Sequence, residues 1–114
     1  MFHVAVLAVV ASQTISVSPA SVRFDHVQTV KGKDWPVIEF CSRTVRLRLE
    51  SPQNELKIGT AKVKTDGTFR RRWTPRRAKV GAGRWRLVVR MHCESGEDGS
   101  TVTVKRSRII RIRN

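Results

Sequence analysis

The sequence predicts an all-β domain, a two-sheet antiparallel β-sandwich of about seven or eight strands. Short runs of Val, Ile, Leu, Thr and aromatic residues alternate with charged residues, and turn-forming residues interrupt these runs at regular intervals. No segment has the sustained apolar spacing of an amphipathic helix. A chain of 114 residues can bury one modest core but not two, so we expect a single domain.

The first predicted strands are short. Residues 14–22 form an expected edge strand that Pro19 interrupts, because proline has no N–H for a ladder hydrogen bond. A second strand is expected from Phe24 to Val30, and the segment from Lys31 to Pro36 is rich in turn-forming residues. The residues after it lead into Cys41, beside the next strand.

The middle of the chain contains two strands with clean alternation. In residues 45–50 (VRLRLE) the Val and Leu side chains face inward, and the charged ones face water. A turn at 51–54 separates this strand from a second one at 56–64. Asp66-Gly67 then predicts a β-hairpin, because both residues tolerate the positive φ of a tight hairpin turn.

The strand after this turn contains a conflict. Phe69 and Trp73 lie on one face, and Arg71 shares their phase. Burying an unpaired charge is costly, so Arg71 needs an explanation. We expect either a β-bulge or an edge position from which the stem packs and the guanidinium reaches solvent.

The last two strands are the longest. Residues 84–93 place Trp85, Leu87, Val89, Met91 and Cys93 on the core side, and Arg84, Arg86, Val88, Arg90 and His92 on the solvent side. Residues 94–100 form an acidic, glycine-bearing loop. Residues 101–112 complete the sheet, with Val102, Val104, Ile110 and Ile112 directed inward.

The N-terminus resembles a secretory signal peptide. The apolar run from Phe2 to Ala11 has the length of a signal-peptide core and is too short to span a bilayer, and Val9-Val10-Ala11 fits a cleavage site. We interpret residues 1–13 as a signal peptide and residues 14–114 as the domain. A positively charged n-region is missing, so either the start is truncated or the segment is a first strand.

The two cysteines, Cys41 and Cys93, are predicted to form a disulfide if the domain is exported. Closing a loop of about 52 residues would stabilise the fold by about 4 kcal/mol through the entropy of the unfolded chain. The alternative is two buried free thiols in a cytosolic protein.

The charge is the outlying property of this chain. It has 23 basic and 9 acidic residues, a formal net charge of +14, which favours polyanionic partners such as nucleic acid, acidic surface polymers or anionic lipid head groups. The alternative is that genome base composition has placed arginine at exposed strand positions. If the sheets bring them to one face, the candidate arginines for an anionic partner are Arg70, Arg72, Arg76, Arg77, Arg86, Arg90, Arg106 and Arg108.

A series of motifs resembles a known group of domains. In order, they are Val17-Ser-Pro19, Gly32-Lys-Asp-Trp-Pro36, a cysteine before VRLRL, Gly59-Thr-Ala61, Thr65-Asp-Gly-Thr-Phe69, and Gly83-Arg-Trp-Arg-Leu87 leading to Cys93. Over residues 14–113 the chain thereby resembles immunoglobulin-like β-sandwich domains of secreted and cell-surface proteins of actinobacteria and related bacteria. The resemblance implies a fold and no catalytic residues. By analogy with such domains, Trp85 would pack against a Cys41–Cys93 bridge.

Nothing in the sequence indicates catalysis, a cofactor or a metal. The histidines His3, His26 and His92 have no suggested nucleophile beside them. A zinc site from Cys41, Cys93, His26 and His92 would lack the short paired ligand spacing of structural zinc sites. A calcium site from Glu94, Glu97 and Asp98 would lack the regular spacing of a calcium loop.

The function predicted from these observations is that of a non-enzymatic, secreted or cell-surface binding or structural module whose basic face associates with an acidic polymer. One alternative is an intracellular nucleic-acid-binding β domain, although no RNP, KH or zinc-finger signature is present. Another is a small-ligand carrier that uses the cleft between the loops at one end of the sandwich.

Overall fold

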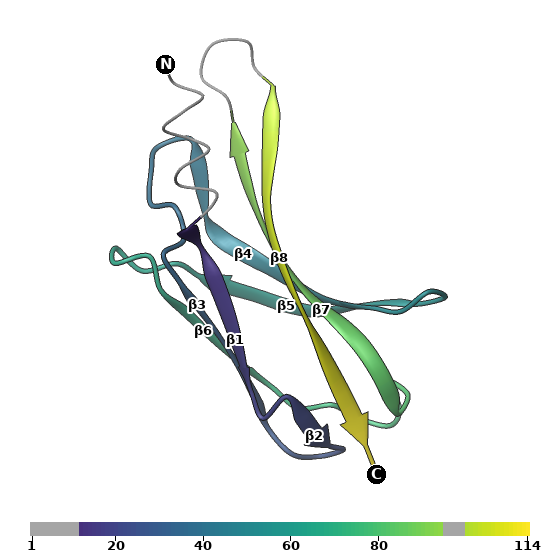
Figure 1. The fold of residues 1–114 in the computed structure, drawn as a ribbon. Coiled ribbons are helices and arrows are strands. Elements are labelled where there is room, and N and C mark those ends of the chain that lie inside the picture. The colour runs from purple at the N-terminus through teal and green to yellow at the C-terminus, as the bar shows by residue number, and fades with distance from the viewer. Residues whose placement is uncertain (1–11, 95–99) are drawn as a thin grey trace.

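The structure, a computed structural model, describes residues 12–94 and 100–114 and contains two β-sheets (Figure 1). The strands are β1 (Thr14–Ser18), β2 (Ser21–Arg23), β3 (Gln28–Lys33), β4 (Cys41–Glu50), β5 (Glu55–Lys62), β6 (Phe69–Trp73), β7 (Gly83–Glu94) and β8 (Thr101–Arg113). One sheet has the order β1-β3-β6, and the other has the order β2-β8-β7-β4-β5. The predicted all-β sandwich is therefore confirmed.

Pro19 transfers the start of the chain from one sheet to the other. Before it, β1 pairs antiparallel with β3, and after it, β2 pairs parallel with β8. The predicted strand over 14–22 is thus two strands in two sheets. Because Pro19 cannot donate a backbone hydrogen bond, the ladder ends there, and the chain is free to cross the end of the sandwich.

This strand order is that of an immunoglobulin-like sandwich. The strands β8, β7, β4 and β5 take the places of G, F, C and C′ in one sheet, and β1, β3 and β6 take those of A, B and E in the other. The chain therefore has an immunoglobulin-like fold. It differs in its disulfide, which in antibody domains joins B and F across the two sheets.

The disulfide forms as predicted between Cys41 and Cys93, but it lies within one sheet. The two cysteines face each other in the register of β4 and β7, with a Cα–Cα distance of 4.0 Å. Trp85 stands eight residues earlier on β7, about 27 Å away along an extended strand. The expectation that Trp85 packs on the bridge is therefore wrong.

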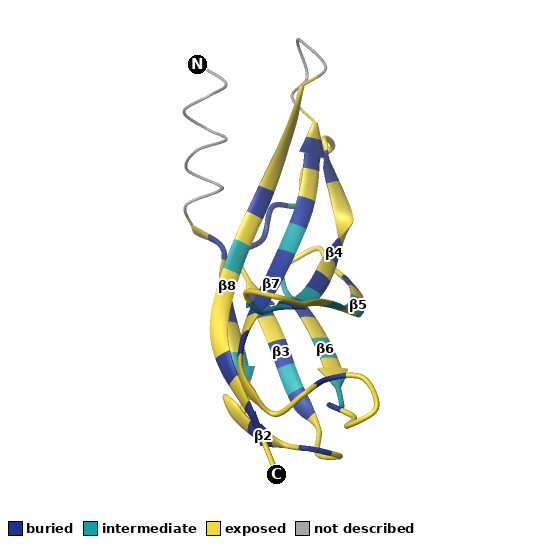
Figure 2. Ribbon diagram, turned by 90° about the vertical axis from the view of Figure 1, so that its right-hand side faces the viewer, coloured by how far each residue is buried: buried dark blue, intermediate teal, exposed yellow. Residues whose placement is uncertain are grey.

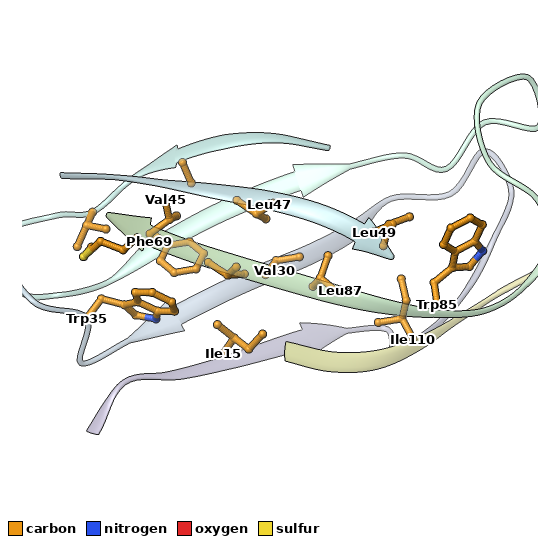
Figure 3. Close-up of a cluster of buried hydrophobic side chains, with 14 of the residues drawn as sticks. Ile15, Val30, Trp35, Val45, Leu47, Leu49, Phe69, Trp85, Leu87 and Ile110 are labelled. Carbon is orange, nitrogen blue, oxygen red and sulfur yellow. The ribbon is translucent and has the colours of Figure 1, made fainter. Parts of the chain in front are cut away.

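The core is made by the inward side chains of both sheets, and buried and exposed positions alternate along the strands (Figure 2). Leu47, Leu49 and Leu87 are fully buried in its middle. At one end Trp35 meets Phe69 edge-on, with 5.5 Å between ring centroids, and at the other end Trp85 lies near Ile110 (Figure 3). The indole N–H groups of Trp35 and Trp85 donate to backbone carbonyls, which satisfies their polar atoms.

The strands β7 and β8 continue past the start of β1. Arg106 of β8 already lies level with Gln13, so the first residues of β8 extend beyond the described part of the three-stranded sheet. Val102, predicted to face the core, is 37% exposed there, and nearby Phe40 is 45% exposed. Val102 has the correct phase, but no described strand of the other sheet faces it.

The Asp66-Gly67 turn does not make the predicted hairpin. It joins β5 and β6, which lie in different sheets and pair with β4 and β3. The turn itself is closed by Lys64 N–H donating to Thr68 O and Gly67 N–H donating to Lys64 O. Two hydrogen bonds from Thr68 lower the pKa of the Asp66 carboxyl group. The bond from the Thr68 hydroxyl has the larger effect, and the bond from the Thr68 backbone N–H has the next largest. A favourable turn sequence fixed the local geometry, whereas the packing of the flanking strands decided their partners.

Two further strand boundaries, and the burial of one residue, differ from expectation. Strand β3 spans Gln28–Lys33 instead of the expected Phe24 to Val30, and β4 begins at Cys41 instead of at Val45. Val88, which was placed on the solvent side, has the outward phase but is completely buried.

Gly32 allows Phe69 to lie against the backbone of β3. A Cβ at Gly32 would stand 1.9 Å from the Phe69 ring, whereas one at Gly81 would meet nothing within 4 Å. We expect Gly32→Ala to lower the free energy of unfolding by about 1–3 kcal/mol because it overpacks this contact. The matched change Gly81→Ala should leave it unchanged or raise it slightly. Urea denaturation followed by tryptophan fluorescence measures both, and equal stabilities of the two variants would contradict this packing.

Candidate functional site

The structure separates the eight arginines that the sequence singled out. They are divided among the outer face of the three-stranded sheet (Arg70, Arg72), the loop after β6 (Arg76, Arg77), the outer face of the five-stranded sheet (Arg86, Arg90) and the gap between the two sheets at one side (Arg106, Arg108). The eight arginines therefore do not lie on one face, which was the condition for a single continuous basic surface.

The outer face of the five-stranded sheet carries rows of like charge, and we call it the basic face. The register places Arg46 of β4 opposite Arg90 of β7, and Arg90 opposite Lys105 of β8. Towards the other end of the sheet Arg84 faces Arg111 in the same way. Further outward cations of this face are Arg23, Arg48, Lys57, Lys62, Arg86 and Arg113.

Two carboxylates partly neutralise the basic face. Arg90 pairs with Glu50 at 3.2 Å, and Arg48 pairs with Glu55. Glu50 stands opposite Arg86, so the Arg90 side chain must extend past Val88 to reach it. This explains why Val88 is buried on an outer face: arginine stems cover it. No ion pair is formed by Arg46 or Lys105 within the described residues.

The outer face of the three-stranded sheet is a second, smaller basic surface. Lys31 of β3 lies directly opposite Arg70 of β6, and Lys33 and Arg72 are their outward neighbours. All four side chains are exposed, and none of the strands of this sheet contains an acidic residue. This surface lies on the opposite side of the sandwich from the basic face.

Arg106 and Arg108 have a structural role, because their side chains connect the two sheets. They have the inward phase of β8, the same as Val104 and Ile110, and they stand where the two sheets separate. Nε of Arg106 donates to Gln13 O at 3.0 Å, and Nε of Arg108 donates to Ile15 O at 3.2 Å. The phase of these arginines was visible in the sequence, but their partners at the start of β1 were not.

Arg71 also donates a hydrogen bond from one sheet to the other, on the opposite side of the sandwich. It lies on the edge strand β6 with its side chain directed inward, and Nη1 donates to Thr60 O of β5 at 3.3 Å. The edge position predicted as one of two explanations for Arg71 is therefore confirmed.

A bulge in β5 makes room for the Arg71 guanidinium. Leu47 faces Gly59 and Arg48 faces Lys57, so Ile58 is the extra residue. Gly59 has φ +151°, and a Cβ there would lie 2.7 Å from Nη2 of Arg71. A glycine is thus required at this point by both the backbone and the guanidinium.

A groove lies where β5, β6 and the loop after β6 meet. Its volume is about 380 Å³. Leu56, Ile58, Trp73 and Val80 give it apolar surface, and Lys57, Arg71, Arg76 and Lys79 supply its charge. Arg76 also pairs with Asp25 at 2.9 Å, and both of these side chains are largely exposed.

The candidate ligands for a metal are dispersed or engaged. The disulfide occupies Cys41 and Cys93, so they cannot serve the imagined zinc site with His26 and His92. Over residues 12–94 and 100–114 no three His, Cys, Asp or Glu side chains gather as a metal site. Glu97, Asp98 and His3 lie outside the described residues. No helix within the described ranges is long and apolar enough to cross a membrane.

Comparison with known proteins adds little beyond the fold. No protein-family description matches the sequence, and no curated protein is similar to it. A solved structure of murine CRIg aligns with 89% of this chain and 96% of that chain, at 14% sequence identity and a TM-score of 0.43. The fold assignment rests on the strand order and pairing described above.

The bridging arginines can be tested through stability. Arg71→Met or Arg106→Met keeps an apolar stem but leaves a carbonyl without its charged donor, and we expect each to lower the free energy of unfolding by about 1–2 kcal/mol. Arg70→Met, on the outward side of the same strand as Arg71, should change it by less than about 0.5 kcal/mol. Denaturant titration compares the three. If Arg70→Met lowered the free energy of unfolding as much as Arg71→Met, the hydrogen bond from Arg71 to Thr60 O would not be a specific source of stability.

Proposed function

We propose that this protein is a non-enzymatic, secreted or cell-surface binding module whose basic face associates with an acidic polymer. The observation that carries the proposal is the row of Arg46, Arg90 and Lys105 across three neighbouring strands, repeated by Arg84 and Arg111. It supports the same kind of surface role as that of the immunoglobulin-like domains of secreted and surface bacterial proteins that the sequence resembles.

The energetics of the rows favour an anionic partner. Like charges directly opposite each other on paired strands destabilise a sheet. Neighbouring strands lie about 4.8 Å apart, so three cations fall within about 10 Å of one another across the sheet. A polymer with closely spaced anionic groups, laid across the strands, would remove this repulsion and gain charge-assisted hydrogen bonds to the guanidinium groups.

The location outside the cytoplasm is supported by the cysteines. A disulfide in a small domain persists in oxidising compartments and is rare in the cytosol. The apolar N-terminal run adds a second argument, since it has the length of a signal-peptide core.

The burial of the tryptophans disfavours the nucleic-acid alternative. Single-stranded nucleic acid is commonly held by aromatic side chains on which its bases stack. Here Trp35 and Trp85 are buried, and the indole of the half-buried Trp73 donates to Gln28 Oε1 at 2.8 Å. The basic face itself contains no tryptophan, phenylalanine or tyrosine, so it offers charge without a stacking platform.

Retention on immobilised heparin, an acidic polysaccharide, tests the proposal. We expect the protein to bind at low salt and to elute as ionic strength rises, because exposed charges are screened. The double variant Arg46→Gln/Lys105→Gln should elute at clearly lower salt. The matched double variant Lys31→Gln/Arg70→Gln removes the same charge from the opposite sheet and should change elution less. Equal effects of the two variants would assign retention to net charge, and no retention at low salt would contradict the proposal.

Export predicts a defined mass for the native protein. Cleavage after Ala11, at the site that Val9-Val10-Ala11 offers, would leave Ser12 as the first residue. It would keep Gln13, which the sequence boundary at residue 13 assigns to the leader but which is buried and whose carbonyl accepts a hydrogen bond from Arg106. We expect an intact mass that corresponds to residues 12–114 less two hydrogens for the disulfide. A native mass with the leader attached and both thiols reduced would support the intracellular alternative instead.

A further inference from the structure

We infer that the groove between β5 and β6 is a binding site for a small amphipathic anion, a molecule with an aromatic or aliphatic body and one carboxylate, sulfonate or phosphate group. This inference concerns a different part of the molecule from the basic face and does not depend on polymer binding. It differs also from a carrier site between the loops at one end of the sandwich, because the groove opens at the side where the two sheets separate.

The groove has the size and the mixed lining that such a ligand requires. A volume of about 380 Å³ falls within the range of small-molecule sites, roughly 300–1,000 Å³. Ile58, Trp73 and Val80 provide apolar contacts for the body of a ligand. The lining contains no acidic residue, and besides Thr74 the polar side chains that could orient a charged group of the ligand are cationic.

The positive charge of the groove is largely uncompensated. Of its four cationic residues, Arg76 has the only ion pair within the described part of the chain, with the exposed Asp25. Lys57, Arg71 and Lys79 have no carboxylate partner there. Arg71, Arg76 and Lys79 line this concave site, and so does Lys57, which is also the register partner of Arg48 on the basic face. A cleft lined by charge of one sign attracts ions of the opposite sign.

Arg71 is the residue that the site is built around. Of its five N–H donors it uses one, in a bond of 3.3 Å to Thr60 O, and its Nε is sealed from solvent with no hydrogen-bond partner in the described residues. An unsatisfied buried donor costs stability unless something compensates for it. An anionic group bound beside the guanidinium, with a small shift of that group, would satisfy its free donors.

The backbone around Arg71 has been adapted to hold it. The β5 bulge turns Ile58 towards the groove, and Gly59 leaves space for the guanidinium. β-Bulges are frequent beside functional sites because they re-aim side chains.

The experiment is a titration of the isotope-labelled protein with naphthalene-1-sulfonate, followed by amide NMR shifts. Naphthalene-1-methanol, which has the same body without charge, and inorganic phosphate, which has charge without the body, are the matched ligands. We expect saturable shifts at the amides of residues 56–60 and 71–80, and affinities at least tenfold weaker for naphthalene-1-methanol and for phosphate. Equal affinity for either control, or shifts spread over the basic face, would overturn the inference.

Variants then test the residues. Arg71→Gln should weaken sulfonate binding about tenfold or more, as expected for the loss of a buried charged donor. Because this variant also loses its bond to Thr60, Lys57→Gln provides a second test, with an expected loss of about two- to fivefold. Lys62→Gln, an exposed lysine of the same strand outside the groove, should leave binding unchanged. If Lys62→Gln weakened sulfonate binding as much as Lys57→Gln, binding would depend only on the net charge of the protein, and this result would overturn the inference.

Discussion

Apolar contact between two sheets of unequal length governs the rest of this structure. The strands of the three-stranded sheet have five or six residues, whereas β7 and β8 have twelve and thirteen. Where the short sheet covers the long one, alternate side chains such as Leu47 and Leu87 are completely buried. Beyond the start of β1 no strand within the described residues of the short sheet faces β8, and Val102 is 37% exposed there although its phase is correct. The Cys41–Cys93 bridge lies beside Val102 in the register and joins two strands of the long sheet, and both of its cysteines are buried members of the core.

Because this disulfide lies within one sheet, the two sheets must be held together by other means. The core supplies most of the attraction, through burial of apolar surface. The open sides need polar closure, since the edge strands β1 and β5 present carbonyls there. Arg106 and Arg108 donate to the carbonyls of Gln13, just before β1, and of Ile15 in β1 on one side, and Arg71 donates to a carbonyl of β5 on the other. Arginine suits this position because a long apolar stem can pack at the rim of the core while its planar head donates across the gap.

The fold could be predicted from the sequence, but the candidate sites could not. The difference is that the fold class follows from local patterns, whereas the sites depend on how distant strands pair. Alternation along a strand is local, so the inward residues of 45–50 and 84–93 and the conflict at Arg71 could be identified without coordinates. Strand pairing is not local. The Asp66-Gly67 turn formed, but β5 and β6 joined different sheets because each had a better partner elsewhere. The rows on the basic face depend on register between β4, β7 and β8, so the alignment of Arg46, Arg90 and Lys105 could not be predicted from the sequence. The groove depends on a bulge at Ile58 and on the separation of two edge strands, and neither has a sequence signal as strong as alternation.

The arrangement of the arginines also bears on the compositional explanation of the charge. Base composition would place arginine wherever a strand position is exposed, with no relation to its neighbours across the strand. The inward arginines do not fit this, because three of them reach particular carbonyls of the facing sheet.

The positions of the acidic residues also bear on the compositional explanation. Glu50 and Glu55 neutralise Arg90 and Arg48, yet neither forms an ion pair with Arg46 or Lys105. A sheet selected for stability alone would place carboxylates within these rows, since opposite charges across strands stabilise and like charges destabilise. Apart from the Glu50 carboxylate that reaches Arg90, the rows contain no carboxylate partner within the described residues, and this supports the proposal that the basic face binds an anion from outside the chain.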